Sequence, residues 1–217
     1  MPMPESIIEQ LFKPHTDQRF NELCIELFRY QHKNNTVYGR FVDFLGKNPK
    51  AIQHYRDIPF MPIGFFKSHR VVSGDFEPEV VFTSSGTTGL TNSRHHVKST
   101  ELYIKSFVHG FQHFFGSIEQ YTILALLPSY LEREGSSLVL MADQLIKRSH
   151  QTESGFFLHD YNNLADVLVQ LKALKKPVIL LGVTYALLDM AEQFPIHFPE
   201  LIVMETGGMK GKRKEMV

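Results

Sequence analysis

The sequence predicts an α/β fold in which an N-terminal helical segment precedes a largely parallel sheet flanked by helices. Two observations lead to this prediction. Apolar residues recur at helical spacing within residues 1–50, whereas residues 51–217 alternate short apolar runs with amphipathic segments of helix length. Strands that alternate with helices indicate crossover connections and therefore parallel pairing. We expect a helical segment at 1–50 and an α/β region at 51–217.

The N-terminal segment is expected to hold three amphipathic helices between Ser6 and Gly46. Their apolar residues recur every three or four positions, the spacing of one helix face. These residues are Ile7, Ile8, Leu11, Phe20, Leu23, Leu27, Tyr30, Tyr38, Phe41, Phe44 and Leu45. Thr16 or Asp17 could cap the second helix, and the chain from Gly46 to Pro49 would end the third. We interpret all three as core-forming helices.

Helical periodicity fails between Pro49 and Pro78, where Pro59 and Pro62 are incompatible with a continuous helix. We therefore expect Ile58 to Val72 to be extended or looped. Strands are predicted at 80–83, 121–127, 156–158, 178–181 and 201–205, and helices at about 99–115, 136–147, 164–175 and 185–194. Ligands of a parallel sheet gather at the carboxyl ends of its strands.

Composition argues against several classes of protein. The 23 Lys and Arg residues balance 23 Asp and Glu residues, so the chain lacks the basic field typical of nucleic-acid binding, and we expect no nucleic-acid partner. The longest apolar runs are far shorter than the ~20 residues of a transmembrane helix. The N-terminus also lacks a basic region followed by an apolar run. We expect no membrane span and a cytoplasmic location.

The single cysteine and a pair of histidines are weak candidates for chemistry. Cys24 cannot form an intramolecular disulfide or a thiolate cluster, and its amphipathic surroundings favour a packing role over a nucleophile. His109 and His113 share a helix face, but Gly110 stands where the zinc-helix motif has Glu. We assign no metal ligand.

An aromatic stripe lies on the same predicted helix. Helical stripes usually face the interior, so we interpret this one as core, with the wall of an acyl tunnel as the alternative. Its residues are Phe107, Phe111, Phe114 and Phe115.

The most informative segment runs from Thr83 to Gly89, directly after the apolar run Val80 to Phe82. Gly86 and Gly89 let backbone amides approach a ligand, and the Ser and Thr hydroxyls add donors. Successive N–H groups of this kind bind anions, so the loop suits a polyphosphate. The P-loop ending and the three-glycine dinucleotide fingerprint are both missing. Composition alone leaves open a simple turn between a strand and a helix.

The stretch Ser84-Ser85-Gly86-Thr87-Thr88-Gly89 resembles the phosphate-binding signature of the adenylate-forming superfamily of acyl-CoA synthetases, adenylation domains and luciferases. Four further stretches resemble, more particularly, the acyl-protein synthetase family of bacterial luciferase fatty-acid reductase systems. They are 58–62 with 66–69, 127–133, 135–138 with Met141, and 205–211. The resemblance implies the fold of the large N-terminal domain of adenylate-forming enzymes, truncated here, with the small C-terminal domain absent.

The resemblance also implies roles for individual residues. Ser84 to Gly89 would hold the β- and γ-phosphates of ATP, and Thr206 to Gly208 would lie against adenine. The superfamily motif usually continues with Lys, whereas this chain reaches its next cation at Arg94, which would act less directly. Thr87 and Thr88 are the expected catalytic residues. The expected nucleotide-binding residues are Ser84, Ser85, Gly86, Thr87, Thr88, Gly89, Arg94, Thr206, Gly207 and Gly208.

The implied reaction is attack of a substrate carboxylate on the α-phosphorus of Mg-ATP. Pyrophosphate leaves, and a mixed anhydride forms for transfer to a thiol of a protein or of coenzyme A. ATP and Mg²⁺ are the implied cofactors, and a fatty acid is the implied carboxylic acid substrate. Loop amides and hydroxyls would orient the leaving pyrophosphate, while Mg²⁺ would supply most of the positive charge.

Several elements of the superfamily cannot be placed in this sequence: the acidic residue for Mg²⁺, the Asp for the ribose, the hinge, and the C-terminal domain with its catalytic Lys. We therefore expect an N-terminal fragment that binds nucleotide weakly and turns over little or not at all. A non-catalytic nucleotide- or acyl-binding module is the alternative. An unrelated α/β hydrolase or transferase ranks last, because no Gly-x-Ser-x-Gly elbow follows a strand.

Four polar residues outside the loop are candidates for substrate contact. Ser129 and Tyr130 follow the predicted strand 121–127 and are assigned to the substrate pocket, with simple packing of Tyr130 as the alternative. Lys67 and His69 lie in a stretch that matches the family, where a substrate or interface role competes with a solvated surface position.

Overall fold

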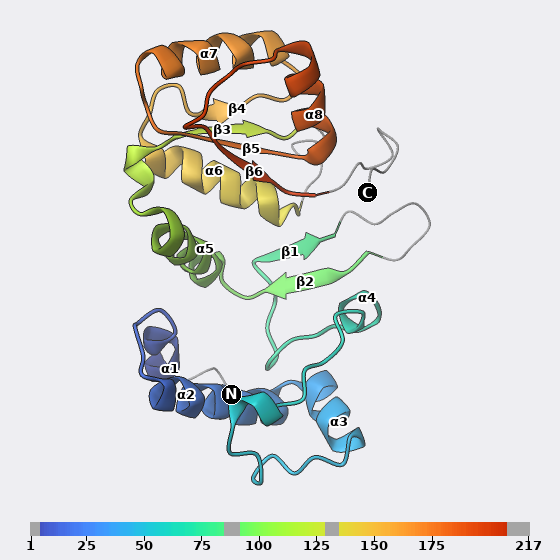
Figure 1. Cartoon of the computed structure of the whole chain (residues 1–217). Coiled ribbons are helices and arrows are strands. Elements are labelled where there is room, and N and C mark those ends of the chain that lie inside the picture. The colour runs from blue at the N-terminus through green and yellow to red at the C-terminus, as the bar shows by residue number, and fades with distance from the viewer. Residues whose placement is uncertain (1–4, 85–91, 129–134, 208–217) are drawn as a thin grey trace. The chain divides into compact units, whose positions relative to one another are not determined.

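A computed structural model describes residues 5–84, 92–128 and 135–207 of the 217-residue chain. The chain divides into two compact units, residues 1–103 and 104–217. Figure 1 shows the elements of the first unit in blue to green and those of the second in green to red.

The first unit begins with three helices, as predicted. They are α1 (Glu5–Gln10), α2 (Asp17–Asn34) and α3 (Thr36–Phe44). Thr16 caps α2, since its hydroxyl oxygen accepts the N–H of Arg19 and satisfies one of the free amides of the first turn. Asn35 caps α3 in the same way by accepting the N–H of Tyr38. Side-chain caps thus fix where both helices begin.

A small apolar cluster holds these helices to the segment that follows them. Its buried members are Ile25, Phe28, Tyr38, Val42 and Ile52. The Tyr38 hydroxyl donates a hydrogen bond to the Pro59 carbonyl over 2.7 Å. The segment Ile58 to Val72, expected to be extended or looped, contains the short helix α4 (Phe65–Ser68), which is preceded by the 3-10 turn η1 (Tyr55–Asp57).

An antiparallel hairpin completes the first unit. It pairs β1 (Val80–Thr83) with β2 (Arg94–Val97), and α5 (Thr100–Phe115) follows. The sequence predicts β1 and α5 but not β2, so the loop after β1 leads to a strand and not directly to a helix. Glu79 secures the start of α5, because its carboxylate accepts the N–H of Thr100 over 2.6 Å and the Thr100 hydroxyl over 3.0 Å.

The second unit is built on a four-stranded parallel sheet in the order β4-β3-β5-β6. Its strands are β3 (Thr122–Leu126), β4 (Gly155–Phe156), β5 (Val178–Gly182) and β6 (Ile202–Glu205). Its helical elements are η2 (Ile118–Gln120), α6 (Ser137–Ser149), α7 (Tyr161–Ala173) and α8 (Thr184–Gln193). Figure 1 shows α6 and α7 on opposite faces of the sheet. The predicted α/β architecture with a parallel sheet is confirmed.

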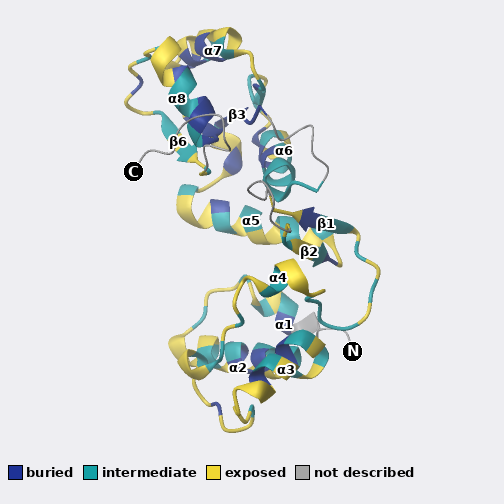
Figure 2. Ribbon diagram, turned by 90° about the vertical axis from the view of Figure 1, so that its right-hand side faces the viewer, coloured by how far each residue is buried: buried dark blue, intermediate teal, exposed yellow. Residues whose placement is uncertain are grey.

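The core lies on both faces of this sheet. Every residue of β3 and β5 is buried, as expected of parallel strands covered on both sides. Buried residues are dark blue in Figure 2, where β3 is labelled. Ile123 and Ile179 are paired in register and join a cluster that includes Phe111 of α5 and Leu145 of α6. A larger cluster packs the sheet against α6, α7 and α8.

The aromatic stripe of α5 divides between core and surface. Phe111 is buried and its ring centroid lies 5.2 Å from that of Phe115, which packs against the same cluster. Phe114 is 78% exposed, and His109 and His113 are exposed as well. The core interpretation therefore holds for Phe111 and Phe115 and is wrong for Phe114.

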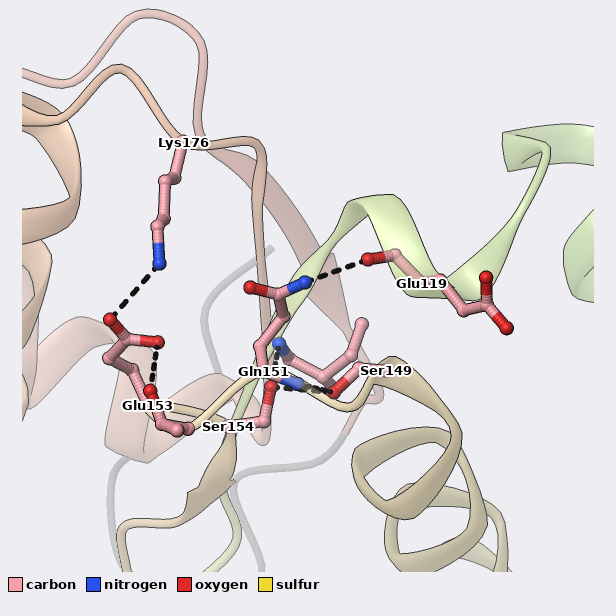
Figure 3. A network of polar contacts seen from close by, with 8 residues as sticks. Glu119, Ser149, Gln151, Glu153, Ser154 and Lys176 are labelled. Carbon is pink, nitrogen blue, oxygen red and sulfur yellow. Dashed lines mark hydrogen bonds and ion pairs between the residues drawn. The ribbon is translucent and has the colours of Figure 1, made fainter.

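A hydroxyl pair holds the loop before β4 against the start of β3. The Ser154 oxygen accepts the N–H of Ile123 over 2.9 Å, and the Ser149 hydroxyl lies 2.8 Å from it. Nearby, the Gln151 amide donates to the Glu119 carbonyl over 2.8 Å (Figure 3). These bonds lie at the amino ends of the strands.

Candidate functional site

The predicted phosphate loop is held by the hairpin at its base. Thr83 of β1 is paired with Arg94 of β2. Beyond this pair, the Ser84 N–H donates to the Ser93 carbonyl over 3.2 Å, and the Ser84 hydroxyl oxygen accepts the Ser93 N–H over 3.0 Å. The two bonds close the base of the loop. The candidates Ser85, Gly86, Thr87, Thr88 and Gly89 lie outside the described residues.

Two groups at this base can bind an anion. The Ser84 oxygen accepts a hydrogen bond from Ser93, but its own hydroxyl proton can still be donated. The Arg94 side chain is exposed and forms no hydrogen bond or ion pair with the described part of the chain. A hydroxyl and a guanidinium are both good partners for phosphate oxygens. The base of the loop therefore offers one neutral and one positively charged donor.

The histidine next to Arg94 faces the other way, because neighbouring strand residues alternate between faces. The His95 ring lies 6.2 to 6.4 Å, between centroids, from three aromatic rings. These are Phe66, Phe82 and Tyr103. Desolvation, and then the charge of His96, lower the pKa of His95. The lowered pKa favours the neutral imidazole of His95, whereas the Arg94 guanidinium keeps its positive charge.

The carboxyl edge of the parallel sheet is a second candidate region. β3 connects through α6 to β4 on one side, whereas β5 connects through α8 to β6 on the other. In open parallel sheets, ligands bind where two neighbouring strands send their connections in opposite directions. Since β3 and β5 are hydrogen-bonded neighbours, the topology favours a ligand between their carboxyl ends.

Gly182 ends β5 at this edge and is paired with Leu126 on one side and Glu205 on the other. A Cβ atom at Gly182 would lie 2.7 Å from the Leu187 side chain, so the position has no room for one. The Thr206 N–H donates to the Gly182 carbonyl over 3.0 Å, and the Thr206 hydroxyl lies 3.3 Å from the same oxygen. The backbone of β6 is thus tied to β5 one residue beyond the strand.

The Glu205 carboxylate links the start of α8 to the turn after β6 at the same edge of the sheet. The Thr184 hydroxyl, at the start of α8, donates to Oε1 of Glu205. The Gly207 N–H donates to the same oxygen over 2.6 Å. Gly207 has a φ of 60°, in the region that favours glycine. Thr206 and Gly207 therefore lie in a hydrogen-bonded turn at the end of β6.

In the first unit, Ser84 and Arg94 both lie at the base of the hairpin loop. In the second unit, Thr206 and Gly207 lie together in the turn after β6. The remaining candidates, Gly208, Ser129 and Tyr130, lie outside the described residues.

Thr184 and Glu205 were not among the residues that the sequence assigns to the site. The available signal was the predicted strand 178–181 followed by a helix, which places Thr184 at a carboxyl end.

The structure gives little support for a nucleophilic cysteine or for a metal site in the described residues. Burial raises the pKa of the Cys24 thiol, which disfavours the thiolate that a nucleophile needs. Within residues 5–84, 92–128 and 135–207, no group of three or more His, Cys, Asp or Glu side chains is arranged to hold a metal ion.

None of the helices in residues 5–84, 92–128 and 135–207 is both long enough and apolar enough to cross a membrane.

Comparison of the chain with protein-family models, with curated proteins and with solved structures found no match. The resemblance to adenylate-forming enzymes therefore rests on the quoted sequence stretches alone. The α/β fold rests on the strand order and the helices described above.

Proposed function

We propose that the chain carries the nucleotide-binding part of an ATP-dependent enzyme that activates a carboxylic acid, with a fatty acid as the first candidate, to an acyl-adenylate for transfer to a thiol. One observation carries this proposal. The glycine- and hydroxyl-rich segment that resembles the superfamily's phosphate loop is held at its base by the Ser84–Ser93 bonds, with the exposed Arg94 beside it.

The phosphates of ATP would bind at this loop. Thr87 and Thr88 would donate hydroxyl protons to the β- and γ-phosphates, together with loop amides. Ser84 would add its hydroxyl proton, and Arg94 would neutralise part of the charge. Closing the base of the loop reduces the entropy lost when the loop orders around a ligand.

The resemblance assigns the segment from Thr206 to Gly208 to the adenine base. Gly207 presents backbone without a side chain, which lets a flat ring approach closely. The hydrogen bonds from Thr184 and Gly207 both go to Oε1 of Glu205, and Oε2 has no hydrogen-bond partner within the described residues. Oε2 could accept a hydrogen bond from the exocyclic amine of adenine.

The proposed chemical step needs no nucleophile from the protein. A carboxylate oxygen of the acid attacks the α-phosphorus, a new P–O bond forms, and the bond from that phosphorus to the bridging oxygen breaks. The electron pair leaves with pyrophosphate. A thiolate then attacks the acyl carbonyl and displaces AMP, which gives a thioester. The chain's own groups would orient the phosphates and stabilise the leaving charge.

Magnesium would arrive with the nucleotide, since Mg²⁺ usually binds through substrate phosphates with one or two carboxylates and several waters.

The test measures nucleotide binding and chemistry separately. Mg-ATP binding is measured by isothermal titration calorimetry on the chain and on its Thr87→Ala and Arg94→Ala variants. Arg148→Ala, which changes an exposed arginine on α6, is the control. We expect each loop variant to weaken binding about tenfold, the effect of losing roughly 1.4 kcal/mol.

Acid-dependent exchange between ATP and pyrophosphate is then measured on the full-length gene product with fatty and aryl acids. Exchange that requires an acid and is lost in Thr87→Ala supports adenylation. ATP binding without exchange for any acid would favour the non-catalytic nucleotide-binding module. A folded chain that binds no ATP would contradict both.

A further inference from the structure

A surface hollow of about 280 Å³ lies in the first unit, between α3 and α4. It belongs to neither the loop nor the sheet edge described above. The residues that line it are Thr36, Val37, Arg40, Phe41, Phe44, Phe65 and His69.

The walls of the hollow are aromatic and partly fixed. The rings of Phe41 and Phe65 meet edge to face with centroids 5.7 Å apart, and Phe65 stacks on His69 at 5.2 Å. Phe41 also packs against the apolar cluster beneath the helices. Phe44, in contrast, is 90% exposed. The hollow thus has a supported floor and one wall that is open to solvent.

The formally charged side chain in the lining of the hollow is Arg40. The Arg40 side chain forms no hydrogen bond or ion pair with the described part of the chain, and no Asp or Glu is among the lining residues. His69 is also in the lining, with Nδ1 lying 2.8 Å from the Ser68 hydroxyl. A ligand that fits this hollow would therefore pair an apolar group with a negative one.

The volume of the hollow helps to decide whether its ligand is a small molecule or the side chain of a partner protein. Pockets for small ligands usually span about 300–1,000 Å³ and enclose most of the ligand. This hollow is at or below that range, and Phe44 remains in solvent. Protein interfaces, in contrast, are enriched in aromatic and Arg anchors that meet one bulky side chain of a partner.

A further exposed apolar residue lies near Phe65 in the sequence. Ile63, two residues before Phe65, is 83% exposed, and its carbonyl accepts the Phe66 N–H at the start of α4. Contiguous exposed apolar side chains often mark sites of interaction with proteins.

We propose that the hollow between α3 and α4 is a docking site for a partner protein, which inserts a bulky apolar side chain between Phe41, Phe44 and Phe65 and pairs an adjacent carboxylate with Arg40. The proposal does not depend on nucleotide binding. It rests on the ring geometry, on the exposure of Phe44 and on the unpaired positive charge.

The test uses random dodecapeptides displayed on phage and selected on the full chain, followed by fluorescence anisotropy with the enriched peptides. The variants are Arg40→Glu and Phe44→Ser. Arg148→Glu and Phe114→Ser are matched controls, because they change an exposed arginine and a 78% exposed phenylalanine in the second unit. Circular dichroism checks that all four variants are folded.

We expect the enriched peptides to share a bulky apolar residue beside Asp or Glu. Their binding should weaken about tenfold or more in Arg40→Glu and Phe44→Ser, as for an anchor residue of an interface, and should stay within about twofold in the controls. Failure to enrich any peptide, enriched peptides without acidic residues, or equal binding by all variants would overturn the proposal. Light scattering measures self-association of the chain. Self-association that Phe44→Ser abolishes would assign the hollow to a second copy of the chain and would also overturn the proposal of a partner protein.

Discussion

The hydroxyl of Thr184 donates a hydrogen bond to the carboxylate of Glu205, which joins the first residue of α8 to the last residue of β6. The same carboxylate oxygen accepts the N–H of Gly207. One side chain therefore fixes both the start of a helix and the turn that leaves the sheet. The carboxyl edge of β5 and β6 is held in one arrangement by these bonds.

Replacing Thr184 by Val removes the donor while keeping the shape of the side chain. We expect a loss of about 1 kcal/mol of unfolding free energy, because Glu205 is exposed and water replaces part of the lost bond. The measurement is urea unfolding followed by circular dichroism, since the chain has no tryptophan. Thr152→Val is the control: its hydroxyl bonds the adjacent Glu153 and joins no two elements. Equal losses in the two variants would show that the link between α8 and β6 adds no stability.

Gly182 and Gly155 provide a matched pair within the same sheet. A Cβ at Gly182 would lie 2.7 Å from Leu187, whereas nothing lies within 4 Å of a Cβ at Gly155. We expect Gly182→Ala to destabilise the chain by about 1–3 kcal/mol through overpacking, and Gly155→Ala to be neutral or stabilising. Thermal unfolding of both variants checks this. A Gly182→Ala variant as stable as Gly155→Ala would mean that Leu187 moves aside at little cost.

The elements that the sequence predicts well are those with a strong pattern. β3 and β5 appear as continuous apolar runs because helices cover both of their faces. β2 could not be predicted in this way, since Arg94, His95 and His96 give no alternation of apolar and polar residues. Its strand conformation comes from pairing with β1, a contact that no local pattern encodes.

The candidate site also contains features that residue types predict and features that depend on strand pairing. The Ser/Thr/Gly loop can be located from residue types alone, because backbone freedom and hydroxyl donors are properties of those residues. The link between Thr184 and Glu205 cannot, since it exists only because β5 and β6 are neighbours in the sheet. Ser93 closes the base of the predicted phosphate loop for a similar reason, through the register of the hairpin.

Substitution of Ser154 tests the contribution of the Ser149–Ser154 hydroxyl pair at the amino ends of the strands. Replacing Ser154 by Ala leaves the N–H of Ile123, a residue only 1% exposed, without its acceptor. An unsatisfied buried N–H costs about 1–3 kcal/mol, and we expect a loss in this range in urea unfolding. Ser117→Ala is the control, because Ser117 is exposed and makes no capping bond. A loss no larger than that of the control would mean that water reaches Ile123 in the variant.

His95 should make stability depend on pH in the mildly acidic range. Desolvation and the charge of His96 lower the pKa of His95 below its ordinary value of 6.5, so the unfolded chain takes up the proton first. The contribution of His95 is therefore complete above about pH 6.5 and is lost as the pH falls below it. We expect His95→Gln to lose less stability than the unaltered chain between about pH 7.5 and pH 5.5. Parallel pH profiles of the two proteins would contradict this.

Tyr38 should produce the opposite dependence at alkaline pH. Burial raises the pKa of Tyr38 to about 12, and its hydroxyl donates to the Pro59 carbonyl over 2.7 Å. Because the folded chain keeps this proton where the unfolded chain releases it, the Tyr38 contribution is complete below about pH 10 and is lost as the pH rises from about 10 to 12.

We therefore expect two effects of Tyr38→Phe in urea unfolding. Near neutral pH the variant should lose about 1 kcal/mol, since the Pro59 carbonyl loses its donor. Above about pH 10 its stability should fall less steeply than that of the unaltered chain, so the two curves converge. Convergence separates a titrating, buried hydroxyl from a side chain that only packs, because a packing loss would shift the whole curve by the same amount at every pH.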